Sequence, residues 1–241
     1  MSDSGIELDT ITAVILAGGK GTRLGSSVAD RPKVMAEVDG RPFITYLMDQ
    51  LDEKLINKVV FCTGYMADFI ENRIGYTYKG LDIIYSEEKE PLGTAGALKN
   101  AQSHLDSEYI LVMNGDSFVE YDLHPFIMCQ VKQKTVTSIL LTKVEDVSRY
   151  GDIEVNSEGE VKRFTEKGGT SGSGWINAGV YLMKKEVLNT VPDERRYSLE
   201  KQFFPTLVGK GLCGCQIGKR FIDIGTPESF ATAEYFFKNL T

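Results

Sequence analysis

The amino-acid sequence predicts an α/β fold in which a mostly parallel sheet is covered by helices. Short apolar runs rich in β-branched residues recur along the chain, and stretches of helical periodicity separate most of them. The first run ends in a cluster of glycines, as expected of a buried strand that leads into a loop. The composition of the 241 residues, 42% hydrophobic and 25% charged, is that of an ordinary globular domain.

The expected elements follow from the position of these runs. Strands are predicted at 11–16, 59–62, 81–85, 109–113 and 137–141, and helices at 43–52, 66–73, 95–105, 125–133 and 198–208. A last helix opens at Thr226-Pro227-Glu228, where threonine can cap and proline fits the first helical position. Between 152 and 183, short strands and Gly/Ser turns predict a small antiparallel insertion beside a substrate. Because no repeat or long polar linker divides the chain, we expect 1–241 to form one domain.

Charge and hydropathy exclude several classes of partner. The net charge of −7 argues against a nucleic-acid partner, since affinity for a phosphate backbone depends on clustered Lys and Arg. No apolar run approaches the ~18 residues of a membrane span, and the polar segment 1–10 lacks the apolar core of a signal peptide. We therefore expect a cytoplasmic protein without a membrane partner, and a homo-oligomer stays open. The spacing of Cys62, Cys129, Cys213 and Cys215 matches neither a disulfide framework nor a zinc site, which favours reduced thiols.

The sharpest local motif is the glycine-rich turn after the first strand, Leu16-Ala17-Gly18-Gly19-Lys20-Gly21-Thr22-Arg23-Leu24. Glycines let backbone N–H groups approach phosphate oxygens, and the Lys and Arg add positive charge. The turn lacks both the Gly-Lys-Ser/Thr of a Walker A loop and the third glycine of a Rossmann fingerprint. The alternative is that the glycines only form a tight connection between two elements. Other residues are needed to decide between this alternative and a phosphate-binding turn.

A lysine on a loop supplies that support. In Arg31-Pro32-Lys33, proline restricts the preceding residue to extended geometry, and the short connection to the glycine turn favours a phosphate contact for Lys33. The combined pattern G-G-x-G-T-R-L and P-K resembles the signature of the sugar nucleotidyltransferases. The resemblance extends from Ile11 to about Tyr235. It implies a Rossmann-like three-layer αβα nucleotidyltransferase fold.

Two aspartates resemble the Mg²⁺ ligands of this family. Asp116 ends an apolar strand in Asn114-Gly115-Asp116, and Asp223 lies in Phe221-Ile222-Asp223-Ile224-Gly225-Thr226-Pro227. Each alone would be explained as a turn former or a polar residue beside a helix. The resemblance implies that both bind Mg²⁺, whose preference for oxygen ligands suits two carboxylates and triphosphate oxygens.

Three segments resemble the sugar-binding part of the family, namely Tyr150-Gly151, Phe164-Thr165-Glu166-Lys167 and Trp175-Ile176-Asn177-Ala178-Gly179. The resemblance implies that Glu166 and Asn177 bond to hydroxyls and that Lys167 neutralises the sugar phosphate. It also implies that Gly151 lets the backbone meet the sugar, with Gly179 in the same site. A solvent-facing position on a hairpin is the alternative for Lys167.

The segment from Glu88 to Gly96 resembles the base-recognition loop of the family and implies that Glu88, Gly93 and Thr94 contact the nucleotide. Thymidylyl and uridylyl members usually carry glutamine where this chain has Glu88. A carboxylate only accepts hydrogen bonds, and guanine presents two donors side by side, which favours GTP. A solvated charged turn is the alternative.

The implied reaction is attack of a sugar 1-phosphate on the α-phosphorus of a nucleoside triphosphate, with release of pyrophosphate. Because the phosphate oxygen is already anionic, positioning and charge neutralisation suffice. We expect catalytic roles for Arg23 at the β- and γ-phosphates, Lys33 at the α-phosphate, Asp116 at the metal and Lys167 at the sugar phosphate. The expected nucleotide site comprises Leu16, Ala17, Gly18, Gly19, Gly21, Thr22, Arg23, Lys33, Glu88, Gly93, Thr94 and Asp116.

Three segments look most like D-glycero-α-D-manno-heptose 1-phosphate guanylyltransferases: 40–43, 196–201 and 221–227. GTP and that heptose phosphate are therefore the expected substrates. Mannose-1-phosphate guanylyltransferase and glucose-1-phosphate thymidylyltransferase are alternatives. Two further alternatives come from other classes. A catalytically inactive regulatory subunit that binds sugar nucleotides would be expected to lack some of the residues that bind phosphate or metal. A glycosyltransferase would be expected to show an Asp-x-Asp metal-binding motif.

Overall fold

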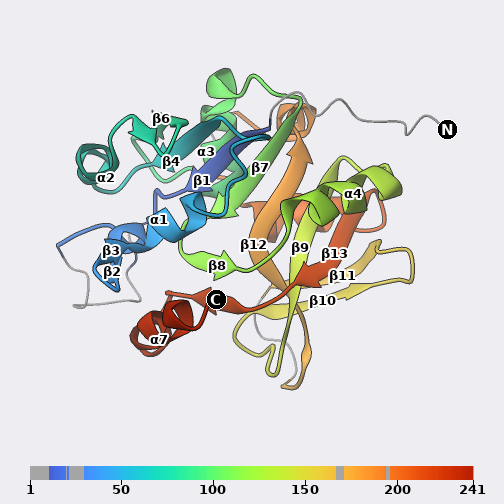
Figure 1. Cartoon of the computed structure of the whole chain (residues 1–241). Coiled ribbons are helices and arrows are strands. Elements are labelled where there is room, and N and C mark those ends of the chain that lie inside the picture. The colour runs from blue at the N-terminus through green and yellow to red at the C-terminus, as the bar shows by residue number, and fades with distance from the viewer. Residues whose placement is uncertain (1–10, 20, 22–29, 167–170, 194–195, 241) are drawn as a thin grey trace.

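The centre of the protein is an eight-stranded mixed sheet with the strand order β13-β9-β12-β7-β1-β4-β6-β5 (Figure 1). The structure is a computed structural model, and it describes residues 11–19, 21, 30–166, 171–193 and 196–240. The strands of this sheet are β1 (Thr12–Leu16), β4 (Lys58–Thr63), β5 (Thr77–Tyr78), β6 (Leu81–Glu87), β7 (Tyr109–Asn114), β9 (Thr137–Val144), β12 (Gly174–Lys184) and β13 (Leu212–Gly218). The run β7-β1-β4-β6 is parallel throughout, so four carboxyl ends meet at one edge. All five predicted strands are confirmed.

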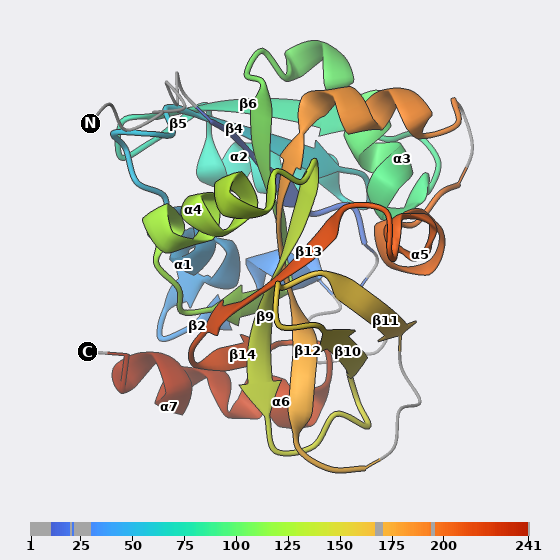
Figure 2. The same cartoon turned by 90° about the vertical axis from the view of Figure 1, so that its right-hand side faces the viewer.

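Helices cover both faces of this sheet. They are α1 (Phe43–Met48), α2 (Ala67–Ile74), α3 (Gly93–Asn100), α4 (Leu123–Gln133), α5 (Phe204–Leu207), α6 (Pro227–Ala231) and α7 (Ala233–Lys238). Figure 2 shows α1 and α4 on one side of the sheet and α3 and α5 on the other. No helix of the described residues combines the length and the apolar character that crossing a membrane requires.

The two-sided burial follows from the pleat of the strands, because successive side chains point to opposite faces. In β1, Ala13 and Ile15 pack in a cluster with Phe126 of α4, whereas Val14 packs in a second cluster with Leu98 of α3. A strand covered on both faces needs a continuous apolar run rather than alternation. This requirement explains why the first strand was readable from the sequence.

One predicted helix, 198–208, has a different form. It consists of a π-helix, Leu199–Phe203 (η5), followed by α5. Pro205 has no N–H group for an α-helical hydrogen bond, so a regular α-helix cannot run through the segment. The capping prediction at Thr226 is confirmed, since its Oγ1 accepts the Ser229 N–H at 3.3 Å and Ser229 Oγ accepts the Thr226 N–H at 3.2 Å.

The antiparallel insertion divides into two parts. β10 (Gly151–Val155) and β11 (Val161–Glu166) form the expected small hairpin. β12 instead enters the main sheet, where it runs antiparallel to both β7 and β9. Two further small sheets pair β8 (Ser117–Val119) with β14 (Phe221–Asp223), and β2 (Glu37–Val38) with β3 (Arg41–Pro42).

The expectation of four reduced thiols is wrong for one pair. Cys129 of α4 and Cys215 of β13 form a disulfide that closes a loop of sequence separation 86, while Cys62 and Cys213 are free. Spacing along the chain carried no sign of this bond because α4 and β13 meet only in the folded protein. Burial raises the pKa of the Cys213 thiol to about 11, so this neighbour stays protonated near neutral pH.

Reduction of the Cys129–Cys215 disulfide is expected to lower the free energy of unfolding by about 2–4 kcal/mol, because the unfolded chain regains the freedom that the cross-link removes. Urea unfolding with and without a reductant measures the difference. A Cys129→Ala/Cys215→Ala double variant should be insensitive to the reductant. Titration of four reactive thiols in the denatured, unreduced protein, instead of two, would contradict the disulfide.

Candidate functional site

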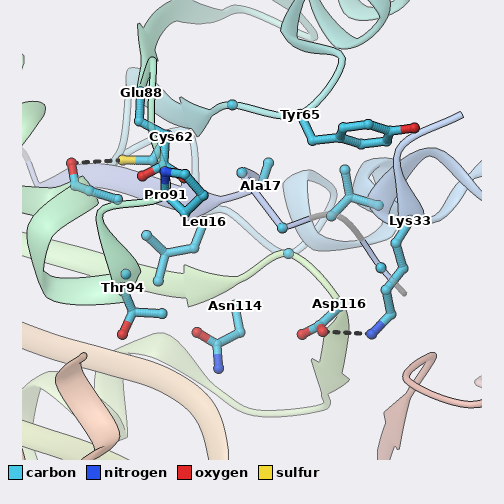
Figure 3. A pocket seen from close by; sticks show the side chains of 18 of the residues that line it. Leu16, Ala17, Lys33, Cys62, Tyr65, Glu88, Pro91, Thr94, Asn114 and Asp116 are labelled. Atoms are coloured by element: carbon cyan, nitrogen blue, oxygen red, sulfur yellow. Dashed lines mark hydrogen bonds and ion pairs between the residues drawn. The ribbon is translucent and has the colours of Figure 1, made fainter. Parts of the chain in front are cut away.

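A cavity of about 800 Å³ opens where the carboxyl ends of β1, β4, β6 and β7 meet (Figure 3). Ligands of open α/β sheets bind at this edge, because the loops that follow the strands converge there. Ten residues expected to bind nucleotide line it: Leu16, Ala17, Gly18, Gly19, Gly21, Lys33, Glu88, Gly93, Thr94 and Asp116. The predicted residues Thr22, Arg23 and Lys167 lie outside the described residues.

The first part of the glycine turn is held in place by backbone hydrogen bonds. The Ala17 N–H donates to Cys62 O at 2.8 Å, and Leu16 O accepts the Gly115 N–H at 2.9 Å. Gly18 is required by close packing, since a β-carbon there would lie 2.8 Å from Glu88 Oε1. The turn thus runs along the cavity wall and contacts Glu88.

Lys33 and Asp116 form an ion pair on the opposite side of the cavity. Lys33 Nζ lies 2.6 Å from Asp116 Oδ2 (Figure 3). The lysine follows Pro32 in a 3₁₀ turn, Lys33–Met35, and its side chain is only 8% exposed, whereas that of Asp116 is 44% exposed. A β-carbon on Gly21 would lie 2.8 Å from Lys33 Cβ, so the glycine turn lies against this side chain. The phosphate contact expected of Lys33 stays a prediction.

Asp223 is brought to Asp116 by the pairing of β14 with β8. Its partner in the register is Ser117, and the next residue, Ile224, donates its N–H to Asp116 O at 2.9 Å. A β-carbon on Gly225 would lie 2.6 Å from Asp223 Oδ1 and 3.5 Å from Lys33 Nζ. The Asp116 carboxylate in the turn before β8, which lines the cavity, and the Asp223 carboxylate at the end of β14 are hard oxygen donors of the kind that fit Mg²⁺.

Glu88 is half-buried at the far end of the cavity. Its Oε2 accepts the Leu92 N–H at 2.9 Å, which leaves most of the carboxylate's acceptor positions open to a ligand. Burial raises the pKa of this carboxyl above its ordinary value, while the Leu92 bond and the Arg196 charge oppose the shift. The side chain is therefore oriented from within the protein before any base arrives.

Hydrogen bonds connect residues that are expected to bind the sugar with residues that line the cavity. Asn177 Nδ2 donates to Tyr181 Oη at 2.9 Å, and its Oδ1 accepts the Gly179 N–H at 2.9 Å. Tyr181 donates to Glu200 Oε1 at 3.2 Å, and Thr94 donates to Glu200 Oε2 at 2.8 Å. Asn177 and Thr94, expected in different subsites, are thus joined through the buried Tyr181 and the partly buried Glu200.

Three of the predicted sugar residues lie outside the described lining of the cavity, namely Gly151, Asn177 and Gly179. Gly151 pairs with Glu166 in the hairpin of β10 and β11, and Asn177 and Gly179 lie on β12. Their contact with a substrate stays a prediction.

Sequence reasoning missed several residues that the fold places at the site. Asn114 lines the cavity, and its buried Oδ1 has no hydrogen-bond partner among the described residues, so it can accept from a ligand. Arg196 adds an exposed positive charge to the same lining. Asn114 stands in the motif that singled out Asp116, a signal that could have found it. Glu200 stands in the segment 196–201 that the resemblance also singled out, whereas Tyr181 had no such signal, because its contacts are tertiary.

Comparison with known proteins places the chain in a family. Residues 12–239 match the family described as nucleotidyl transferase. A D-glycero-alpha-D-manno-heptose 1-phosphate guanylyltransferase of Aneurinibacillus thermoaerophilus is 35% identical over 92% of this chain and 96% of its own. A mannose-1-phosphate guanylyltransferase of Mycobacterium tuberculosis is 33% identical over 91% of this chain and 62% of its own.

A solved structure agrees with these relatives. HddC from Yersinia pseudotuberculosis, complexed with GMP-PN, superposes with a TM-score of 0.82 at 33% identity, over 95% of this chain and 100% of its own. The match extends through the strands that carry the glycine turn, Asp116 and Asp223. With a cavity at the carboxyl edge of a mixed sheet and a family match over almost its whole length, the chain belongs to the nucleotidyl transferase family.

Proposed function

We propose that this protein is a sugar-1-phosphate guanylyltransferase that transfers GMP from GTP to a sugar 1-phosphate, most specifically to D-glycero-α-D-manno-heptose 1-phosphate. The observation that carries the proposal is the arrangement of the cavity. The glycine turn runs from Glu88, at the base end, to the Lys33–Asp116 ion pair at the reactive end. The names of the relatives supply the base and the sugar.

In this reaction, an oxygen of the sugar phosphate forms a bond to the α-phosphorus of GTP as the bond to the β-phosphate oxygen breaks. Pyrophosphate leaves with the electron pair of the broken bond. Lys33, nearly buried beside the glycine turn, is positioned to neutralise charge that develops at the α-phosphate. The first glycines of the turn hold the polyphosphate through backbone N–H groups, and Glu88 accepts hydrogen bonds from the guanine edge.

Asp116 and Asp223 would hold the divalent cation, for which we propose Mg²⁺. When bound, the cation would supply positive charge that offsets the negative charge of the phosphate groups. Lys33 orients Asp116 through the 2.6 Å ion pair, and the Gly225 N–H donates to Asp223 Oδ1 at 2.8 Å. Both carboxylates are thus aligned before substrates arrive.

A pyrophosphate-release screen of the purified protein against a matrix of nucleoside triphosphates and sugar 1-phosphates tests the proposal. We expect the highest kcat/KM for GTP with the heptose phosphate. Preference for mannose 1-phosphate with GTP would move the assignment to the second guanylyltransferase group. Equal or better use of dTTP with glucose 1-phosphate would overturn it, and no release from any pair would favour a sugar-nucleotide-binding regulatory protein.

Glu88→Gln is expected to narrow the preference for GTP over ATP and the pyrimidine triphosphates by roughly tenfold to a hundredfold. The amide replaces an acceptor with a donor opposite the guanine N–H groups, and an unpaired buried polar group costs ~1–3 kcal/mol. Competition kinetics with paired triphosphates measures the change, with Glu158→Gln, on the distant β10–β11 hairpin, as the control for lost charge. An unchanged preference would remove Glu88 from base recognition.

A further inference from the structure

Asp223 is saturated with hydrogen-bond donors in the protein alone. Its Oδ1 accepts the Gly225 N–H at 2.8 Å, and its Oδ2 accepts the Tyr150 O–H at 2.7 Å and an Arg149 guanidinium N–H at 3.1 Å. The side chain is only 18% exposed. A cation that approaches this carboxylate must therefore compete with a positive charge already in contact with it.

Arg149 is the partner best able to leave. Its side chain is 49% exposed, and both side-chain hydrogen bonds that it makes among the described residues end on Asp223. The guanidinium otherwise rests over the Tyr150 ring, 5.1 Å from its centroid, and that ring packs edge-on against Phe221 at 5.4 Å. Tyr150 and Gly225 are fixed by the fold, whereas the guanidinium can rotate into solvent at low cost.

The other positively charged side chain of the site, Lys33, cannot leave its carboxylate as easily as Arg149 can. Lys33 is nearly buried against Asp116, and a β-carbon on Gly225 would lie within 3.5 Å of its Nζ. Two carboxylates that share one site repel each other unless positive charge lies between or beside them. In the absence of metal, Lys33 neutralises one carboxylate and Arg149 the other.

We propose that Arg149 is the resident counter-ion of Asp223 in the substrate-free protein, that it gives up this place when the divalent cation binds, and that it then pairs with the phosphate of the sugar 1-phosphate. The inference rests on the proposed function, which makes Asp223 a metal ligand. Arg149 lies two residues before Gly151, which pairs with Glu166 at the expected sugar site. A freed guanidinium there can hold a phosphate through two parallel hydrogen bonds.

The counter-ion role predicts tighter metal binding when Arg149 is neutralised. In the substrate-free protein, Arg149→Gln should bind Mn²⁺ roughly threefold to tenfold more tightly than wild type, because the metal no longer displaces a charge. Electron paramagnetic resonance of free Mn²⁺ measures this without turnover. A role in stability alone would not tighten metal binding.

Arg163→Gln is the matched control. Arg163 is 50% exposed and pairs with two carboxylates, Asp152 at 2.6 Å and Glu154 at 2.5 Å, on the neighbouring hairpin. The substitution removes the same charge from a similar environment, so Mn²⁺ affinity should stay at the wild-type value. Equal tightening in both variants would reduce the effect to net charge and overturn the proposal, as would an unchanged affinity in Arg149→Gln.

The phosphate role of Arg149 predicts weaker, not tighter, binding of the sugar 1-phosphate when the arginine is replaced. At saturating Mg²⁺, Arg149→Gln should raise KM for the sugar 1-phosphate roughly tenfold, with KM for the triphosphate within about twofold of wild type. Arg149→Lys should restore Mn²⁺ affinity to near wild type and recover only part of the KM, since an ammonium cannot bond bidentately. A KM for the sugar phosphate equal to that of Arg163→Gln would overturn this role.

The Asp223→Asn variant distinguishes a failure of the proposed metal site from a failure of the counter-ion role of Arg149. If this variant binds Mn²⁺ as wild type does, Asp223 is not a ligand, and the proposed metal site itself fails. If it weakens Mn²⁺ binding while Arg149→Gln leaves it unchanged, the metal site stands and only the counter-ion inference is wrong. Thermal unfolding of each variant checks that the fold is retained.

Discussion

Replacing Asp116 or Asp223 by alanine is expected to lower kcat/KM by roughly a thousandfold or more while the protein stays folded. Charge that develops on the phosphates loses several kcal/mol of stabilisation when the divalent cation has no carboxylate to hold it. Asp116 lies in the turn just before β8, and Asp223 ends β14. Both strands are short and lie outside the main sheet, so the core does not depend on the two side chains. Pyrophosphate release and thermal unfolding measure the two outcomes separately.

Asp106→Ala provides the control for this prediction. Asp106 forms an ion pair with Lys58 at the start of β4, away from the carboxyl edge of the sheet, so the substitution breaks a Lys–Asp pair without touching the cavity. Its activity should equal that of wild type. Normal turnover by Asp116→Ala or Asp223→Ala, or full wild-type activity in excess EDTA, would remove the metal assignment.

Lys33→Met is expected to lower kcat by roughly a hundredfold to a thousandfold and to change KM for GTP by less than about threefold. The methionine keeps the apolar stem that packs against Gly21 but removes the charge placed at the α-phosphate, where negative charge builds up in the transition state. Steady-state kinetics with varied GTP at saturating sugar phosphate separates kcat from KM.

The matched control is Lys58→Met, which removes the lysine of the pair at the opposite edge and should retain wild-type kinetics. Because Lys33 also neutralises Asp116, its loss leaves a carboxylate unpaired, and thermal unfolding is compared between the two variants. A change confined to KM in Lys33→Met would make Lys33 a ground-state binding residue and contradict its catalytic role.

Local patterns predicted the elements that position the nucleotide site. The apolar run of β1 and the glycines that follow it are contiguous, so strand, turn and cavity wall were readable together. The same holds for Lys33, which lies beside the turn because a short connection joins the two. It also holds for the Thr226 cap, which bonds to a residue only three positions further along the chain. In each case the interacting atoms are close in the sequence.

Other features of the site were predicted only in part. Glu88 was expected at the base, and the fold places it in the cavity, but its bond to Leu92 and its raised pKa arise from burial. β12 was expected in a small insertion and instead entered the main sheet, because its run of buried residues packs on both faces. Periodicity identified the strand and could not assign it to a sheet.

The sequence by itself determined the fold class, the family and the position of the glycine turn, because these depend on contiguous patterns of apolar residues and glycines. Only the tertiary structure decided three contacts of the site and the core. The pairing of β8 with β14 places Asp223 beside Asp116, Arg149 forms an ion pair with Asp223, and Cys129 forms a disulfide with Cys215. These contacts join segments far apart in the chain. Their geometry follows from how helices and strands pack in three dimensions, which local propensity does not encode.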